Sequence, residues 1–312
     1  MTITTTAVLP PAVRDYYDRL LLMTAYPTLI YTRFAQKRVL PQKSGDRIVF
    51  RRYSRLSTVP VALQDGITPP GAPLSITDIK AQVSFYGNFV TITNQVELTV
   101  EDRVLNESAR LLSQNMAQTI DELTRDVLAS TSNVLECSNG TNGGTPTELS
   151  KADIDSAVTT LLNNDAQMIS SAINASTGIG TAPIRPAFFG FLDVSNLPDL
   201  ENVSNFINTT NYGSTASIQD EWGSTGNVRW LYTSVGSVTS AATAVYNNLI
   251  VGKEAYAIVH LGPDSGEFYV KPLGSAGSSD PLDQRGSVGW QVPFVARLLN
   301  DAFALNLTST LS

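Results

Sequence analysis

The segment VALQDGITPPGAPLS, residues 61–75, connects two runs with the residue pattern of β-strands. These runs are DRIVFRRYSRLSTV, residues 46–59, and ITDIKAQVSFYGNFVTIT, residues 76–93. A hairpin turn usually takes about two to five residues, and this connection is far longer, rich in proline and glycine, and carries the apolar residues Leu63 and Ile67. We therefore predict an extended hairpin that reaches for a surface outside its own turn.

The first of these runs gives the hairpin two mixed faces. With the two-residue period of a strand, one face carries Arg47, Val49, Arg51, Tyr53 and Arg55, and the other carries Ile48, Phe50, Arg52, Ser54 and Leu56. Neither face is cleanly apolar, and an isolated two-stranded ribbon is marginally stable at best in water. We expect the hairpin to complete its burial against a sheet, a helix or a second chain.

Charge is distributed unevenly along the 312-residue chain, whose net charge is −7. Residues 1–60 carry ten lysine and arginine residues against three acidic residues, a balance of +7, and the rest carry eleven against twenty-five, a balance of −14. This asymmetry permits a basic arm of one copy to lie against an acidic body of another, or to touch DNA phosphates. A merely solvated arm is an equal alternative. The overall acidity argues against a general nucleic-acid-coating surface.

The clearest predicted helix follows the hairpin. Thr99 and Asp102 fit a capping box at its start. Apolar residues then recur at spacings of three and four, the stripe of an amphipathic helix: Leu105, Ala109, Leu112, Met116, Ile120, Leu123 and Val127. We expect this helix to run from Val100 to about Ser132, and its opposite, acidic face to carry Glu101, Glu107, Asp121, Glu122 and Asp126.

The remainder of the chain is predicted to form an α/β unit followed by C-terminal strands. Ser150 and Asp153 fit the cap of a helix. PAFFGFLDV (186–194) has the pattern of a buried strand, and DLENVSNFI (199–207) that of a short helix. Three or more strands are expected from residue 249 onward.

Composition is that of a folded protein, with 42% hydrophobic and 16% charged residues, and the length suggests roughly two domains. The N-terminal segment lacks the charged and apolar regions of a signal peptide. The apolar run LLLMTAYPTLI (20–30) has eleven residues, fewer than the about twenty of a membrane helix. We expect cytoplasmic synthesis and no membrane association. The single cysteine, Cys137, cannot form an internal disulfide.

Residues suited to catalysis or metal binding are scarce. One histidine, His260, and one cysteine exclude Cys/His zinc sites and Cys–His nucleophile pairs. His260 lies in the strand-like run AYAIVHLG, so a structural histidine with satisfied hydrogen bonds is expected. Glu221 beside Trp222 raises a glycosidase hypothesis, but a solvated loop beside a packed tryptophan is favoured. We predict no enzymatic activity, no cofactor and no metal.

The order of these elements resembles that of the major capsid proteins of tailed bacteriophages, with the Hong Kong 97-type fold. The local sequence is similar to the family typified by the coat protein of phage N-four. Five segments carry the resemblance in the family's order: LQDGITPPGAPLSITDIKAQVSFYGNFVTIT (63–93), NMAQTIDELTRDVL (115–128), WGSTGNVRWLYTS (222–234), LIVGKEAYAIVHL (249–261) and GWQVPFVARLLNDAFALNLT (289–308). Residues 165–220 match nothing in it that we can name.

The resemblance implies an α+β fold in five parts. These are an N-terminal arm (1–45), an extended hairpin loop (46–98), a peripheral domain with a long spine helix (99–149), an axial domain (150–250) and C-terminal strands that return to the peripheral domain (251–312). It also implies a coat protein that self-assembles into the icosahedral head of a phage, and therefore a location in the virion.

The implied partners are many copies of the chain in hexamers and pentamers, and packaged double-stranded DNA on the inner face. About 45 residues precede the hairpin, so we expect scaffolding to come from a separate protein if it is needed; a portal and minor decoration proteins complete the set. The candidate inter-subunit contacts, in which arginines of the hairpin meet acids of a neighbour, are Arg47, Arg51, Arg52, Arg55, Leu63, Asp65, Ile67, Glu101, Asp102 and Glu107.

Three other functions stay open at this point. A cellular nanocompartment of the same fold would enclose an enzyme rather than a genome. A β-rich adhesin or surface protein would need export, for which the sequence shows no signal peptide. A glycan hydrolase would depend on Glu221.

Overall fold

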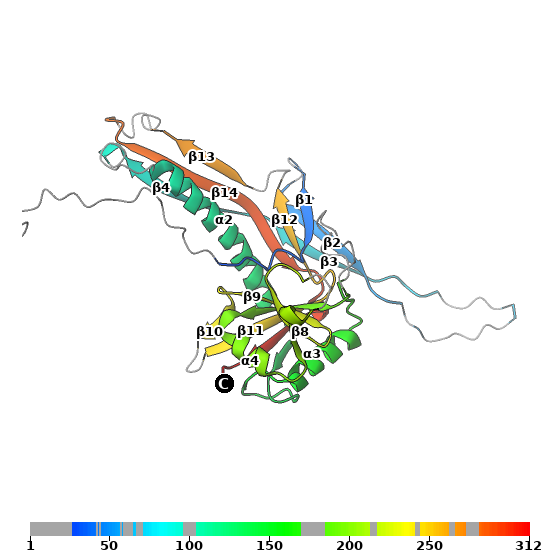
Figure 1. The fold of residues 1–312 in the computed structure, drawn as a ribbon. Coiled ribbons are helices and arrows are strands. Elements are labelled where there is room, and N and C mark those ends of the chain that lie inside the picture. Colours follow the sequence, from blue (N-terminus) through cyan, green and yellow to red (C-terminus); the bar gives the residue numbers. More distant parts are fainter. Residues whose placement is uncertain are drawn as a thin grey trace, which may run out of the picture.

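The computed structural model describes residues 27–41, 43, 45–56, 58, 65–66, 71–95, 104–169, 185–212, 217–240, 244–261, 266–272 and 281–312. Two mixed β-sheets with helices packed against them make up the body, and a two-stranded ribbon extends from it (Figure 1). The α+β class is therefore confirmed. The predicted capping box of Thr99 and Asp102 lies outside the described residues.

The first sheet has five strands, in the order β1 (Gln36–Leu40), β12 (Tyr256–Leu261), β14 (Arg285–Leu298) and β13 (Glu267–Lys271), with β4 (Ser84–Thr93) on the other side of β14. At fourteen residues, β14 is long enough to pair with β12, β13 and β4. It is therefore the central strand on which this elongated part of the molecule is built.

Helix α2 (Val104–Ala129) lies along this sheet, and its apolar stripe is buried as predicted. Leu112 packs with Val288, Trp290, Val292 and Phe294 of β14, and the rest of the described stripe surrounds this cluster: Ala109, Met116, Ile120, Leu123 and Val127. The helix ends at Ala129, slightly before the expected Ser132, because the chain turns there into β5 (Val134–Glu136).

The second sheet has eight strands, in the order β5, β15 (Ala304–Ser309), β11 (Ala244–Val251), β6 (Phe188–Asp193), β9 (Val228–Thr233), β8 (Glu221–Thr225) and β7 (Phe206–Asn208), with β10 (Ser237–Ser240) beside β11. Helices α3 (Lys151–Asn163) and α4 (Leu197–Asn202) cover one face. The capping box of Ser150 and Asp153 at the start of α3 is confirmed.

The strand predicted within 186–194 is confirmed as β6, and alternate side chains face opposite layers. Phe188 and Leu192 face α3 and α4, whereas Phe189 and Phe191 face the N-terminal segment. Gly190 is required here, because a Cβ at this position would lie 2.3 Å from the Trp230 ring.

The helix predicted at 199–207 is displaced. Helix α4 begins at Leu197 and ends at Asn202, and Phe206–Asn208 forms strand β7 instead. Val203 is already extended, with a φ of −65° and a ψ of 129°, and it ends the helix. Asn205, with a φ of +66°, prevents a right-handed helix from resuming before β7.

Residues 27–36 join the two sheets. Ile30, Tyr31 and Phe34 are buried against the second sheet, and the Tyr256 hydroxyl donates to the Tyr31 carbonyl at 2.5 Å. Arg33 forms an ion pair with Asp220. The N-terminal segment is thus part of the core rather than a surface addition.

Asp121 on α2 anchors this segment, contrary to its expected place on an acidic face. Its carboxylate accepts the backbone N–H groups of Ile30, at 3.1 Å, and Thr32, at 3.0 Å, and it is fully buried. Burial raises the pKa of Asp121, and the backbone amides of Ile30 and Thr32 oppose this shift. One buried and one partly buried donor thus depend on this acidic side chain.

Replacing Asp121 with alanine should lower the free energy of unfolding by about 2–4 kcal/mol, because each buried donor left unpaired costs about 1–3 kcal/mol. Urea unfolding of the unassembled chain measures this. The matched control is Asp126→Ala, whose side chain is 62% exposed and should change stability by at most about 0.5 kcal/mol. Equal losses in the two variants would contradict the anchoring role.

Candidate assembly interface

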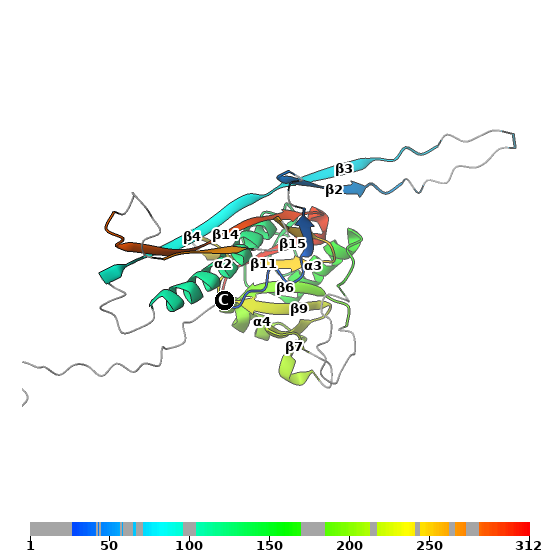
Figure 2. The same ribbon diagram turned by 90° about the horizontal axis from the view of Figure 1, so that it is seen from above.

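The ribbon that extends from the body is the hairpin of β2 (Arg47–Tyr53) and β3 (Ile76–Gln82). Strand β3 continues past Val83 into β4, so that one long run of chain belongs first to the hairpin and then to the five-stranded sheet (Figure 2). The predicted hairpin is therefore present, and residues 59–64 and 67–70 of its connection lie outside the described residues.

The apolar packing of the hairpin against the body is confined to its base. Ile48 and Phe50 are partly buried against Leu40, Val83 and Val259. The Val83 N–H donates to the Asp46 carbonyl at 2.8 Å and joins the two strands where they leave the sheet. Farther out, Arg51, Arg52 and Tyr53 are exposed. A two-stranded ribbon with so little apolar support is stable only with additional packing.

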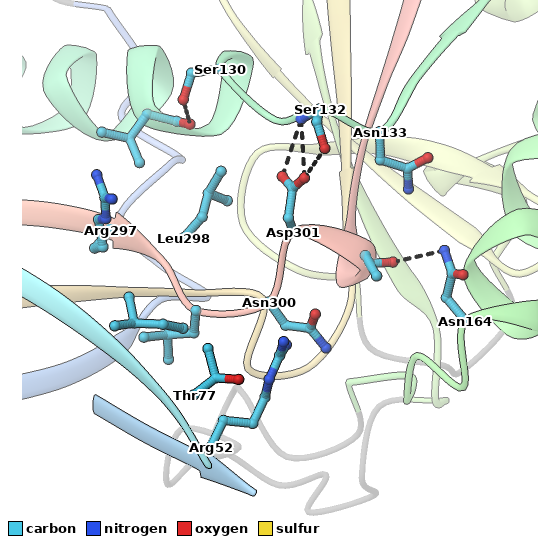
Figure 3. Close-up of a pocket in the computed structure, with 14 residues that line it drawn as sticks. Arg52, Thr77, Ser130, Ser132, Asn133, Asn164, Arg297, Leu298, Asn300 and Asp301 are labelled. Atoms are coloured by element: carbon cyan, nitrogen blue, oxygen red, sulfur yellow. Dashed lines mark hydrogen bonds between the residues drawn. The ribbon is translucent and has the colours of Figure 1, made fainter. Parts of the chain in front are cut away.

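A hollow of about 930 Å³ separates the outer hairpin from the body. Arg52 and Thr77 enter it from the hairpin toward Asn300, and the end of α2 and the segment after β14 form the opposite wall (Figure 3). A second hollow of about 550 Å³ lies at the hairpin base and also contacts Arg52. The inward face of the outer hairpin is therefore open rather than packed.

Asp301 closes the far end of the first hollow. Its carboxylate accepts hydrogen bonds from the Ser132 backbone, at 3.1 Å, and from the Thr131 hydroxyl, at 2.6 Å, and it also contacts the Ser132 hydroxyl (Figure 3). Burial tends to raise the pKa of Asp301, but the bonds from Ser132 and Thr131 outweigh it and hold the pKa below its usual value. This carboxylate thus fixes the turn that follows α2.

The four arginines predicted as contacts lie on the hairpin, and three of them have acidic partners in the same chain. Arg51 pairs with Asp78 across the two strands at 3.1 Å, and Arg55 reaches Asp165 after α3 at 2.7 Å. Arg47 lies 3.9 Å from Asp46. All three pairs are largely exposed, and pairs of this kind contribute only about 0–1 kcal/mol. They can exchange partners at little cost.

Two of the other predicted contacts, Asp65 and Glu107, lie in the described part of the chain, and neither is paired there with these arginines. Glu107 pairs with Arg110 along α2, and Asp65 is an exposed turn residue. Leu63, Ile67, Glu101 and Asp102 lie outside the described residues. Contact between the arginines and these acids of a neighbour therefore stays a prediction.

Exposed apolar side chains lie on the hairpin and on β4, which continues from it into the five-stranded sheet, and they were only partly anticipated. On the hairpin, Tyr53 is 60% and Leu74 is 68% exposed; on β4, Phe85 is 61% and Phe89 is 70% exposed. Large apolar side chains gathered on one extended element indicate an interaction surface. The alternation in residues 84–93 could have identified Phe85 and Phe89, because they are two of the odd-numbered residues that share a face.

Glu221 is not in a solvated loop, and that expectation is wrong. It lies on β8 with its side chain buried, and it receives hydrogen bonds from Arg229 Nε at 2.7 Å and Arg229 Nη2 at 2.5 Å. The Tyr212 hydroxyl, at 2.8 Å, and the Ile218 N–H, at 2.9 Å, complete its shell. A carboxylate held by this many donors serves structure, so the geometry does not support the glycosidase hypothesis.

His260 is a structural residue on β12, but its hydrogen bonding differs from the prediction. Within the residues that the structure describes, its buried Nδ1 atom has no hydrogen-bond partner, and its ring lies 5.3 Å from that of Phe294. Burial and then the charge of Lys37 lower the pKa of His260. At this atom the expectation of satisfied hydrogen bonds is wrong.

The described part of the chain holds no group of three or more His, Cys, Asp or Glu residues arranged for a metal ion. In the same residues, no helix is long and apolar enough to cross a membrane.

Comparison with solved structures shows the same architecture in phage particles. The head structure of Helicobacter pylori bacteriophage KHP40 contains a chain that matches with a TM-score of 0.71 at 14% identity, over 97% of this chain and 96% of that chain. This chain has a phage capsid fold. The capsid of Ralstonia phage GP4 matches with a TM-score of 0.69 at 12% identity, over 100% and 99% of the two chains. The capsid of cyanophage P-SCSP1u matches with a TM-score of 0.68 at 15% identity, over 96% and 94%.

No protein-family model and no curated protein sequence matches the chain. The similarity to this capsid fold is therefore carried by three-dimensional structure, and the expected relation to the phage N-four family stays a prediction.

The buried pair of Glu221 and Arg229 generates a test of its structural role. Glu221→Gln should lower the free energy of unfolding by about 3 kcal/mol, because it leaves the Arg229 charge uncompensated in the interior. Urea unfolding measures the loss. Replacing both residues with methionine should recover part of it, since two apolar side chains leave no buried charge but the Ile218 N–H still loses its acceptor. A Glu221→Gln variant as stable as the wild type would overturn this account.

Proposed function

We propose that the protein is a major capsid protein that self-assembles into the icosahedral head of a tailed bacteriophage. The observation that carries the proposal is the fold match to chains of phage capsid structures over nearly the whole length of both chains. A hairpin whose apolar packing is confined to its base supports it as well, because the exposed apolar side chains farther out are buried only when another chain covers them.

In this proposal the parts have the roles of a Hong Kong 97-type subunit. The hairpin within 46–98 is the extended loop that lies over an adjacent subunit, and α2 is the spine helix of the peripheral domain. Residues 150–250 form the axial domain that meets its copies at five- and six-fold axes. Strands β5 and β15 add to that domain's sheet from the segments on either side.

The hairpin arginines contribute weak, exchangeable contacts in such a shell. Arg51 and Arg55 already have exposed partners in Asp78 and Asp165, so an acid of a neighbour would replace a partner rather than neutralise an isolated charge. A shell that corrects assembly errors benefits from many contacts of this size. Double-stranded DNA on the inner face, a separate scaffolding protein, a portal and minor decoration proteins are the further partners that we propose.

Electron microscopy of the purified chain, with size-exclusion chromatography and light scattering, tests the proposal. Closed polyhedral particles or tubes are the expected result. Nucleic acid rather than protein cargo in particles isolated from the native source would distinguish a phage head from a nanocompartment. A chain that stays a 33.6 kDa monomer with and without its scaffolding partner would overturn the proposal.

Deleting residues 63–72 should leave a folded, soluble chain that no longer closes shells, because the deletion shortens the connection between β2 and β3 and removes none of the described core residues. Circular dichroism measures folding, and electron microscopy measures assembly. A second variant keeps the length but replaces these ten residues with glycine and serine, and it should also fail if the side chains make the contacts. Normal particles from the deletion would refute the arm's role.

A further inference from the structure

Strand β4 is an edge strand with unusual composition. Within the residues that the structure describes, its only ladder partner is β14, so no described strand pairs with its other edge. Its ten residues, SFYGNFVTIT, contain no charge and no proline, and most are exposed. An exposed, uncharged edge of this length is a template for pairing with another strand.

The other edges of the described sheet and hairpin carry the charges that proteins use to prevent such pairing. Strand β1 contains Lys37 and Arg38, β2 contains three arginines, and β13 begins with Glu267 and ends with Lys271. Of these four strands, only β4 has no charged residue. We infer that its edge is covered in the assembled protein.

We propose that β4 pairs in antiparallel register with β4 of a second copy, about a two-fold axis at Gly87. The five-stranded sheets of two copies then form one continuous sheet. This inference rests on the proposed function only in that it needs a second copy; a dimer satisfies it as well as a shell does.

The sequence of β4 is self-complementary about Gly87. A two-fold contact brings each residue near symmetry-related copies of the same surface, so a charged residue beside the axis would meet a like charge. None is present in β4. The axis at Gly87 places Phe85 opposite Phe89 of the partner subunit, and the reverse, on the sheet face away from α2. Aromatic cross-strand pairs of this kind stabilise antiparallel strands.

The rings of Phe85 and Phe89 have room to adjust on this sheet face. A hollow of about 530 Å³ lies over the β14 residue Gly289, between these two rings of β4 and Tyr269 of β13. The Phe89 N–H at present donates to the Asn88 Oδ1 atom at 2.9 Å. Rotation of this exposed amide would release the N–H to a partner strand.

A disulfide measures the register directly. In antiparallel strands, Cα atoms directly opposite lie about 4.5–5.5 Å apart, within the reach of a disulfide. The double variant Phe85→Cys/Phe89→Cys should therefore form covalent dimers under mild oxidation, read on non-reducing gels. Each single variant places its two cysteines four residues out of register, about 13 Å apart along the strands, and should stay monomeric. Wild type controls for the buried thiol of Cys137.

We expect at least a tenfold larger dimer fraction in the double variant than in either single variant. A double variant that stays monomeric would overturn the proposal. The same monomeric result is expected if another strand, such as one from residues 1–26, covers β4 instead of a second copy. Single variants that cross-link as readily would overturn the register. Electron microscopy of the same samples scores particles separately, so particles without cross-links reject this contact and leave the proposed function intact.

A pair of charge variants tests the contact without cysteine chemistry. Phe85→Lys/Phe89→Glu places opposite charges across the axis and should retain association in light scattering. Phe85→Lys/Phe89→Lys places like charges there and should lose it. Both pairs of substitutions are at exposed positions, so circular dichroism should report the same fold. Equal association of the two variants would contradict the pairing.

Discussion

The structure depends on helix α2, which buries side chains on two neighbouring faces. The apolar stripe of α2 packs on β14, and a neighbouring row on the same helix, formed by Asp121, Thr124 and Leu128, is buried toward the N-terminal segment and the second sheet. Because both rows belong to one rigid rod, the two sheets are held in a defined relation. The Ile30 and Thr32 N–H groups donate to Asp121, and these two hydrogen bonds hold the N-terminal segment against the helix.

The outer hairpin lies outside the packing of α2 on the two sheets. Strand β14 is covered on one face by α2 and paired along both edges, yet β3 leaves the sheet and continues outward with β2 alone. Its base is buried and its outer part is not. A two-stranded hairpin that is buried at its base and exposed farther out needs further packing to be stable. In a shell, a neighbouring subunit would supply that packing.

The acidic residues show where one-dimensional patterns fail. Asp121 and Glu221 were assigned to a polar face and a loop, and both are buried and fully engaged. A helical wheel separates apolar from polar residues, but it does not register that backbone amides from a segment 91 residues away point at Asp121. Glu221 likewise meets Arg229 through the pairing of β8 with β9 and through an irregularity in its register.

The sequence by itself determined the elements whose signals are local: the stripe of α2, the capping box of α3, the buried strand β6 and the two long arms of the hairpin. These depend on residue period and capping, which act over a few residues. Only the tertiary structure decided which sheet each strand joins, since β15 and β5 enter the second sheet from distant parts of the chain. It also decided that the edge of β4 is unguarded, because an edge exists only once all partners are placed.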